Sequence, residues 1–270
     1  PILTQRGLPD NRPNPITCVG HADLVQAPEG DWYAVFLGVR PYNGEHDVMG
    51  RETFLLPVTW KDNQPVILPE GETITYTTDR PYGPTPLWTT DGLAPEAFFI
   101  RTPLVSCYEI SGKGQLTLTA SSSDLNDKRQ PAAIGRWINN WTFTAQTALN
   151  FTPGQQGDFA GITCFHDDYC YIRFGKTLDK EGKPMLSLEA YSRGKLCNQA
   201  SATLPQPNGK IYLKVEGNDA VNYTFSYATS PKGNWTQVGE PVSADLISTQ
   251  TAGGFTGTMV GIYATGNYHN

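Results

Sequence analysis

The chain has 270 residues, a formal net charge of -6 and a pI of about 5.2, and 17% of its residues are charged. This length gives one large domain or two smaller ones, with enough surface to bury a core. The acidic balance and the lack of any Lys or Arg cluster argue against nucleic acid and anionic membranes as partners. No apolar run approaches the roughly 20 residues that cross a bilayer.

Gly and Pro are plentiful, at 27 and 21 residues, and no long stretch of strong helix formers occurs. This mix favours strands joined by tight turns, so we predict an all-β fold. The chain opens on Pro1 without a signal peptide, and residues 1–18 form an irregular lead-in. We therefore expect a further segment of the protein upstream of Pro1.

Four short strands are expected after the lead-in, over residues 21–26, 32–39, 53–60 and 66–68. Four strands in about 45 residues match one blade of a β-propeller. The run Trp32–Val39 is too apolar for a strand that is wet on one side. We predict a blade with one face uncovered by this chain; the alternative is a small sheet packed against the downstream domain.

Residues 69–95 hold five prolines and no regular period, which predicts a linker. From residue 96 to the end, turn signals recur about every ten residues and many segments alternate in polarity, which is typical of a two-sheet antiparallel sandwich. The expected strands are Gln115–Ala120, Trp141–Leu149, Gly161–Phe165, Tyr169–Phe174, Met185–Tyr191, Lys210–Glu216, Asn222–Ala228 and Met259–Ala264.

Five cysteines are present, an odd number that excludes complete internal pairing. Cys164 and Cys170 are the only close pair. Both a disulfide between them and ordinary buried thiols remain open at this point.

Three stretches of the first 68 residues resemble the last propeller blade of family 43 glycoside hydrolases, in the subgroup of β-xylosidases and α-L-arabinofuranosidases. They are GHADLVQ at 20–26, WYAVFLG at 32–38 and GRETFLLPV at 50–58. The lead-in PILT at 1–4 is similar to the segment that enters this blade. The closing run GFTGTMVGIYATGN at 254–267 resembles the end of the subgroup's concanavalin-like C-terminal domain.

The resemblance implies a five-bladed propeller, whose last part is residues 1–68, and a concanavalin-like β-sandwich over residues 96–270. It implies an inverting exo-glycosidase that removes xylose or arabinose from xylan-derived chains, secreted or periplasmic. In the family a base Asp, a second Asp and an acid Glu come from earlier blades, and none maps onto this chain. We therefore expect the chain alone to be inactive, with an upstream propeller segment and a xylo- or arabino-oligosaccharide as partners.

The resemblance also suggests roles for several residues. Arg51 is similar to an arginine that reaches into the sugar pocket, and Glu52 next to it points to the opposite face of the strand. His21 matches a histidine near the propeller axis, beside substrate, the base or a bound cation. Asp23 lies two residues on, so we expect it on the same side of the strand, supporting His21.

A sandwich loop closes over the pocket in the resembled subgroup. The corresponding segment here is residues 153–159, where Phe159 is the nearest stand-in for the expected aromatic, although core packing is the favoured role for it. No cofactor is required, although a structural calcium or sodium ion remains open. The pair Asp167-Asp168 suits either a cation or a turn.

A second function remains open, that of a carbohydrate-binding or scaffolding sandwich without activity of its own. Aromatic rings stack on sugar faces, but most such residues pack in cores. The six candidate tryptophans are Trp32, Trp60, Trp88, Trp137, Trp141 and Trp235.

Overall fold

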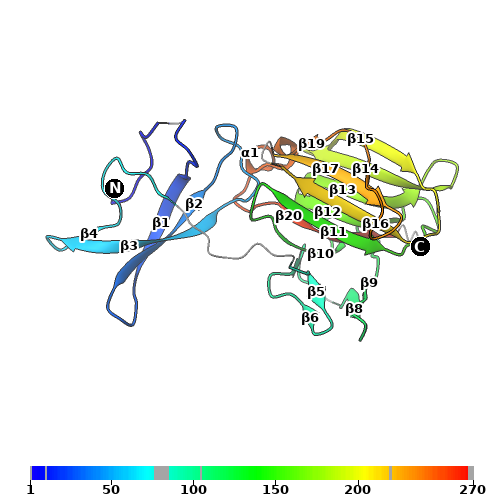
Figure 1. Cartoon of the computed structure of the whole chain (residues 1–270), viewed down its shortest axis with the longest axis horizontal. Helices are drawn as coiled ribbons and strands as arrows, with labels where there is room; N and C mark the ends of the chain where they lie inside the picture. Colours follow the sequence, from blue (N-terminus) through cyan, green and yellow to red (C-terminus); the bar gives the residue numbers. More distant parts are fainter. Residues whose placement is uncertain (1, 10, 76–84, 104, 219–220, 267–270) are drawn as a thin grey trace.

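The computed structural model describes residues 2–9, 11–75, 85–103, 105–218 and 221–266. A small N-terminal sheet lies at one end of an elongated molecule and a larger β-sandwich forms the other (Figure 1). In these ranges the structure contains no helix with the length and hydropathy of a membrane span.

The N-terminal sheet has four antiparallel strands in the order β1-β2-β3-β4, which confirms the predicted four-stranded unit. The strands are β1 (Thr17–Gln26), β2 (Trp32–Val39), β3 (Glu52–Lys61) and β4 (Gln64–Val66). Asp62 and Asn63 both adopt positive φ, at 50° and 63°, between β3 and β4. Such a pair forms the tight two-residue turn whose twist suits a hairpin.

The two faces of this sheet differ in burial. One face packs against the lead-in and the segment that follows β4, in a core of Ile16, Ala34, Phe36, Val58, Ile67 and Ile74. On the other face Val25 is 47% exposed and Leu55 is 59% exposed. The predicted uncovered face is therefore confirmed, and the sheet is not a unit buried by the sandwich.

The segment expected as a linker contains some regular structure. Ile74 is buried in the core of the N-terminal sheet, and its amide donates to the side chain of Gln5. Further on, β5 (Trp88–Thr89) and β6 (Gly92–Leu93) form a hairpin. Residues 76–84 of the expected linker lie outside the described residues.

The sandwich consists of a seven-stranded sheet and a five-stranded sheet, with a separate hairpin. The larger sheet has the order β15-β14-β13-β12-β20-β10-β7, and the smaller has β11-β16-β17-β18 with β19 also pairing with β17. In chain order the elements are β7 (Phe98–Phe99), β8 (Tyr108–Ile110), β9 (Leu116–Leu118), β10 (Ala132–Trp137), β11 (Phe143–Leu149), β12 (Phe159–Asp167), β13 (Cys170–Leu178), β14 (Pro184–Ser192), β15 (Lys195–Thr203), β16 (Ile211–Gly217), β17 (Asn222–Ala228), β18 (Thr236–Gln237), β19 (Val242–Ser243), η1 (Ala244–Ile247), α1 (Thr249–Ala252) and β20 (Met259–Thr265).

Both faces of the seven-stranded sheet are covered. Its inner face packs on the five-stranded sheet through a core that includes Phe174, Leu188, Leu213 and Phe225. Its outer face carries a second core under the segment of residues 98–125, made of Ile100, Leu125, Ala133, Phe159, Phe165, Tyr171, Met259 and Tyr263. Two-sided burial explains why β12 is buried at every position but its last.

All five cysteines are free thiols. Cys164 and Cys170 are both buried in the inner core, and burial raises the pKa of each thiol. The Cys170 sulfur accepts a hydrogen bond from the Arg193 amide. The disulfide considered from the sequence is therefore not formed, and both thiols behave as small apolar groups.

Candidate functional site

The Arg51 side chain lies where the N-terminal sheet meets the sandwich. Its backbone amide donates to the carbonyl of Phe255, and its guanidinium carbon is 3.7 Å from the centre of the Phe255 ring. Phe255 is 64% exposed and Arg51 is also exposed. No hydrogen bond joins the guanidinium to a protein acceptor among the described residues, so its N–H groups are available for a ligand. A cation stacked on an aromatic face in this way is held without using its donors.

A β-bridge and a buried carboxylate fix the backbone next to Arg51 and Phe255. Gly50 forms a β-bridge with Thr256, at a φ of 67° that glycine adopts without strain. The Asp47 carboxylate, 2% exposed, accepts from the Gly50 amide at 2.9 Å, and also from Thr249 Oγ1 at 2.8 Å and Gln250 Nε2 at 2.9 Å. The position of Arg51 against Phe255 is thus set by both parts of the chain.

Glu52 faces away from Arg51. Its carboxylate is held by Arg40, whose Nε lies 2.7 Å from Oε2 and whose Nη2 lies 2.8 Å from Oε1. Arg40 Nη2 also donates to the carbonyl of Asn139 in the sandwich. This bidentate ion pair gives Glu52 a structural role at the junction, in agreement with the alternation of side chains along β3.

The strand geometry at His21 differs from the expectation. His21 has a φ of 53°, and the pairing shifts register between Gly20, opposite Leu37, and Asp23, opposite Val35. His21 and Ala22 of β1 thus lie opposite one residue of β2, Phe36, which is a β-bulge, and the two-residue alternation does not hold across it. Within the described chain no hydrogen bond or ion pair joins His21 to Asp23, and both are exposed. The expectation that Asp23 lies on the same side of the strand as His21 and supports it rested on this alternation, and the bulge removes that basis.

His21 is also the metal-ligand candidate that the sequence offers. No group of three or more His, Cys, Asp or Glu side chains suited to a metal ion occurs in the part of the chain that the structure describes. One imidazole is a single ligand, whereas calcium takes six to eight oxygen ligands. The structural calcium or sodium ion left open by the sequence therefore stays a prediction, and further ligands for it would have to come from other parts of the protein.

Phe159 lies in the outer core. It is 2% exposed and packs against Tyr263, with 5.8 Å between ring centres. It begins β12, whose other end pairs Phe165 with Met259 beside the junction. Loop 153–159 is therefore at the end of β12 away from Arg51. The structure places Phe159 in the core, not over the pocket, because the strand direction carries the loop away from the N-terminal sheet.

The pair Asp167-Asp168 forms a turn and an ion pair. Asp167 Oδ1 accepts from the amides of Tyr169 and Cys170, at 2.8 and 2.7 Å. Both oxygens of Asp168 accept from Arg101 Nη2, at 2.6 and 2.7 Å. These carboxylates serve the sandwich and are not free to bind a cation as a pair.

The described carboxylates with shifted pKa values do not make an acid for hydrolysis. Burial raises the pKa of Glu189, but the charge and hydrogen bonds of Arg173 outweigh burial and leave the pKa below its usual value. Hydrogen bonds from Arg129 lower the pKa of Asp127. A general acid at neutral pH needs a shift in the opposite direction.

Comparison with known proteins agrees with this architecture. Residues 88–270 match the family described as "Beta xylosidase C-terminal Concanavalin A-like domain", and residues 1–65 match "Glycosyl hydrolases family 43". The chain belongs to glycosyl hydrolase family 43. The N-terminal sheet is accordingly the last blade of the five-bladed propeller of family 43, and the remainder is the concanavalin-like sandwich.

Family 43 relatives extend well beyond this chain. The non-reducing end α-L-arabinofuranosidase BoGH43B of Bacteroides ovatus is 30% identical over 278 residues, covering 99% of this chain and 51% of that protein. A xylosidase/arabinosidase of Butyrivibrio fibrisolvens is 26% identical, covering 99% of this chain and 52% of that protein. The chain thus spans about half the length of the curated relatives it matches.

Solved family 43 structures share the fold across both parts. The GH43B structure from Bacteroides ovatus has a TM-score of 0.82 and 29% identity, covering 94% of this chain and 51% of that one. The GH43 protein BlXynB from Bacillus licheniformis has a TM-score of 0.83 and 27% identity, covering 98% and 52%.

Phe255 is the site residue that sequence reasoning missed. The run that contains it, GFTG at 254–257, was used only as a mark of resemblance. Its sequence signal is a glycine-rich segment with a single aromatic residue, a composition typical of an exposed loop. Nothing in the spacing linked this loop to Arg51, because the two residues come from opposite ends of the chain.

Proposed function

We propose that this chain is the C-terminal half of an inverting exo-glycosidase that removes xylose or arabinose from xylan-derived chains. The observation that carries the proposal is the Arg51 guanidinium stacked on the exposed ring of Phe255, with its donors unused by the described protein. A sugar hydroxyl or a neighbouring carboxylate accepts from such a fork. The Phe255 ring then limits the room on the far side of the sugar.

The chemistry itself requires two carboxyl groups about 6.5–9.5 Å apart, one to protonate the leaving oxygen and one to activate water. We propose that propeller blades outside these 270 residues supply them. Hydrolysis of this kind uses only water, so the proposed reaction needs no cofactor. Because polymeric xylan is found outside cells, we propose that the enzyme is secreted or periplasmic.

The uncovered face of the blade gives the proposed docking surface for the upstream segment. Val25 and Leu55 lie on this face, and a repeat unit of a propeller needs a neighbour to bury such a surface. Side chains two residues apart share a face of a strand, so Arg51 lies on the same face as Thr53 and Leu55. Docking on this face would therefore bring the missing carboxylates towards Arg51.

The first test is reconstitution. The chain alone should release no nitrophenol from aryl xyloside or aryl arabinofuranoside, and adding the upstream segment of the same protein should restore turnover. Turnover by the chain alone would contradict the placement of the carboxylates, and binding of xylo-oligosaccharide without any turnover by the complex would favour the alternative of a non-catalytic binding module.

The second test concerns Arg51 in the reconstituted enzyme. Arg51→Ala should lower kcat/KM about 30- to 1,000-fold, which corresponds to a loss of roughly 2–4 kcal/mol of transition-state stabilisation, because a charge-assisted contact is lost. Arg51→Lys should recover little, since an ammonium lacks the planar fork. Arg6→Ala, an exposed arginine in the lead-in, is the control and should remain within about twofold of the parent. An Arg51→Ala enzyme as active as that control would refute the assignment.

A further inference from the structure

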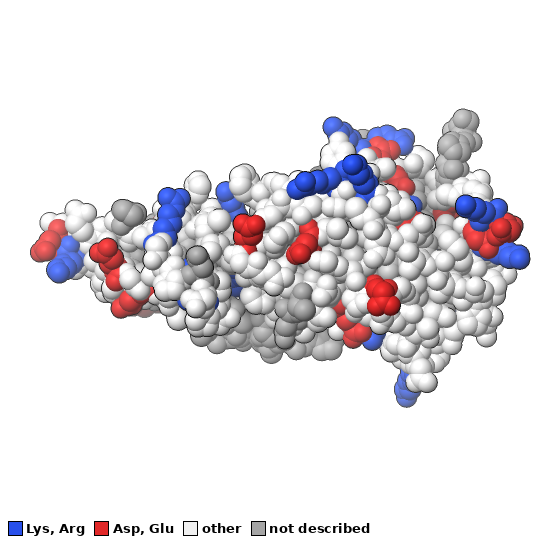
Figure 2. Space-filling model, turned by 90° about the horizontal axis from the view of Figure 1, so that it is seen from above, with Lys and Arg blue, Asp and Glu red and all other residues white. Residues whose placement is uncertain are grey.

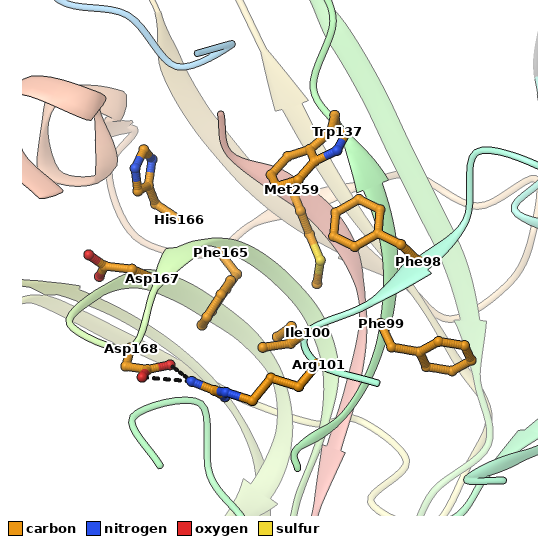
Figure 3. Close-up of a pocket in the computed structure, with 10 residues that line it drawn as sticks. All are labelled: Phe98, Phe99, Ile100, Arg101, Trp137, Phe165, His166, Asp167, Asp168 and Met259. Carbon is orange, nitrogen blue, oxygen red and sulfur yellow. Dashed lines mark hydrogen bonds and ion pairs between the residues drawn. The ribbon is translucent and has the colours of Figure 1, made fainter. Parts of the chain in front are cut away.

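Two neighbouring cavities lie on the outer face of the seven-stranded sheet, within the sandwich, and are together called the groove. It consists of a cavity of about 390 Å³ and a smaller one of about 170 Å³, and both are lined by Asp168. Figure 3 shows the larger cavity, with Trp137 and Phe98 along one wall and the Arg101–Asp168 pair along another. Neither Arg51 nor Phe255 lines it.

An aromatic platform stands at one end of the groove. Trp137 lies in the last position of β10, on the outer face, and is 47% exposed. Its ring stacks on Phe98 with 4.4 Å between centres and 30° between planes. The ring is therefore fixed from behind and open in front, and an apolar ligand face that covers it loses no tryptophan side-chain freedom on binding.

A second group of rings stands at the other end. Tyr169 is 54% exposed and lines the smaller cavity together with Tyr171 and Tyr191. Tyr191 stacks on Tyr171 with 4.8 Å between centres, so these rings are also held in place. A ligand that contacts both Trp137 and Tyr169 must extend over both cavities, which favours a chain over a single small molecule.

The charged side chains that line the groove are Arg101, Asp167 and Asp168. The Arg101 charge is balanced by Asp168, and Arg101 Nη1 is anchored on the carbonyls of Asp127 and Arg129. Arg101 has a φ of 140°, a strained value for a residue with a side chain, and these contacts hold it there. With Asp167 the groove has a small net negative charge, which disfavours an anionic ligand, whereas hydroxyl groups bind to the Arg101–Asp168 pair as both donors and acceptors.

The remaining titratable groups in the groove already have partners. His166 Nε2 lies 3.2 Å from the carbonyl of Gly253, and its Nδ1 lies 3.5 Å from Thr258 Oγ1. Asp167 is occupied by the turn described above. His166 and Asp167 are therefore already bonded within the protein, and Arg101, the lining arginine, is paired with Asp168, so no unpaired cation attracts an anionic ligand among the described lining residues.

We propose that this groove is a second carbohydrate-binding site, which holds a neutral β-1,4-linked xylan chain by stacking on Trp137 and Tyr169. A pyranose ring offers a C–H face to an aromatic ring and hydroxyl groups at its edge, which matches two exposed rings separated by a polar pair. The choice of ligand rests on the proposed function, but the site does not.

The groove lies close to the junction between the sandwich and the blade. Trp137 pairs with Met259, next to Thr258, whose amide donates to the carbonyl of Val48 in the blade loop. The groove thus begins at the end of the sandwich nearest Arg51. A polymer held there raises the effective concentration of its chain end at the catalytic pocket.

The test is calorimetric titration of xylohexaose into the purified chain, which requires no catalysis. The chain should bind xylohexaose, and Trp137→Ala and Tyr169→Ala should each weaken binding by about tenfold or more, because each removes a stacking surface. Trp60→Ala is the matched control, since Trp60 is 48% exposed, makes an edge-to-face contact with the ring of Trp32, and lies on the blade.

Specific outcomes would overturn the proposal. The proposal fails if the chain does not bind xylohexaose. It also fails if the Trp137→Ala, Tyr169→Ala and Trp60→Ala chains all bind xylohexaose equally well. Preference for hexagalacturonate would contradict the neutral ligand. Weaker assembly with the upstream segment in Trp137→Ala, with xylohexaose binding intact, would show that protein covers the groove. In the reconstituted enzyme Trp137→Ala should lower activity on polymeric xylan and leave aryl xyloside hydrolysis unchanged, so the failure of this site differs from the failure of the proposed catalysis.

Discussion

Arg173 is the residue that organises the outer face of the seven-stranded sheet. Its guanidinium lies 3.0 Å from Asp124 Oδ2 and 2.8 Å from Glu189 Oε2. Tyr263 donates to Asp124 at 2.7 Å, and Tyr191 donates to Glu189 at 2.8 Å. The side chains of Arg173 and Glu189 are only 17% and 13% exposed, so the ion pair is weakly screened by solvent.

We predict that this network makes stability depend on acid pH. The folded-state pKa of Glu189 lies below the ordinary value of 4.5, so its contribution is complete above about pH 4.5 and is lost as the pH falls through the folded value. Glu189→Gln should lower the free energy of unfolding by about 1–3 kcal/mol at pH 7 and flatten the loss of stability in acid. Urea unfolding between pH 3 and pH 7 measures both effects.

The control for this prediction is Glu181→Gln, which changes an exposed glutamate in the turn between β13 and β14. It should keep the parent's pH profile. The prediction fails if Glu189→Gln retains the acid slope of the parent.

Lys176 gives a second test at the scale of one residue. Its side chain is fully buried, and Nζ donates to the carbonyls of Phe151, Pro207 and Gly209 at 2.9, 3.1 and 2.7 Å. Lys176→Met keeps the apolar stem but removes the donor from three carbonyls. We expect a loss of about 2–4 kcal/mol in urea unfolding, against less than about 0.5 kcal/mol for exposed Lys180→Met. Equal losses of stability in the two variants would show that the three hydrogen bonds from Lys176 to carbonyl groups contribute nothing.

At the scale of elements, the two faces of the blade should respond differently to substitution. Phe36 is 1% exposed and stacks against Phe54, so Phe36→Ala should cost about 3–5 kcal/mol by leaving a cavity. Leu55→Lys, on the uncovered face, should change the stability of this chain by less than about 0.5 kcal/mol. The same Leu55→Lys change should weaken binding of the upstream segment, because it places a charge on the proposed docking face. A large loss of stability in isolated Leu55→Lys would show that the face is already covered.

At the scale of the whole molecule, a few polar contacts couple the blade to the sandwich. Asp47 is central, because one carboxylate serves the Gly50 amide, Thr249 and Gln250. Tyr42 adds a hydrogen bond to Asp245 at 2.9 Å. Charged side chains are scattered over the surface in Figure 2, without a large field of one sign on that face. Local contacts, and not overall charge, therefore hold the two parts together.

We predict that Asp47→Ala separates the unfolding of the two parts. Three donors lose their acceptor, and the penalty of about 2–4 kcal/mol falls on the junction alone. Calorimetry should show a single transition in the parent and two in the variant, because cooperative unfolding requires coupling. Asp31→Ala, in an exposed turn of the blade, should unfold as the parent does. A single unshifted transition in Asp47→Ala would exclude this role.

The sequence by itself determined the strands of the blade and most strands of the sandwich. The continuous apolar run of β2 and the apolar alternation along β16 and β17 are local information, and they indicate which side chains face a core. The same alternation correctly put Arg51 and Glu52 on opposite faces. It did not reveal β15, an edge strand whose polar residues carry no apolar period, nor β10, a short strand interrupted by a glycine.

Only the tertiary structure decided how distant segments meet. The bulge at His21 broke the expected alternation because an extra residue was inserted into pairing with β2, and Phe159 entered the core because of the direction of β12. Phe255 reached Arg51, and Trp137 met Asp168 across one groove, through contacts between segments far apart in sequence. Periodicity assigns a residue to a face, whereas the partner of that face is set by long-range packing of the whole chain.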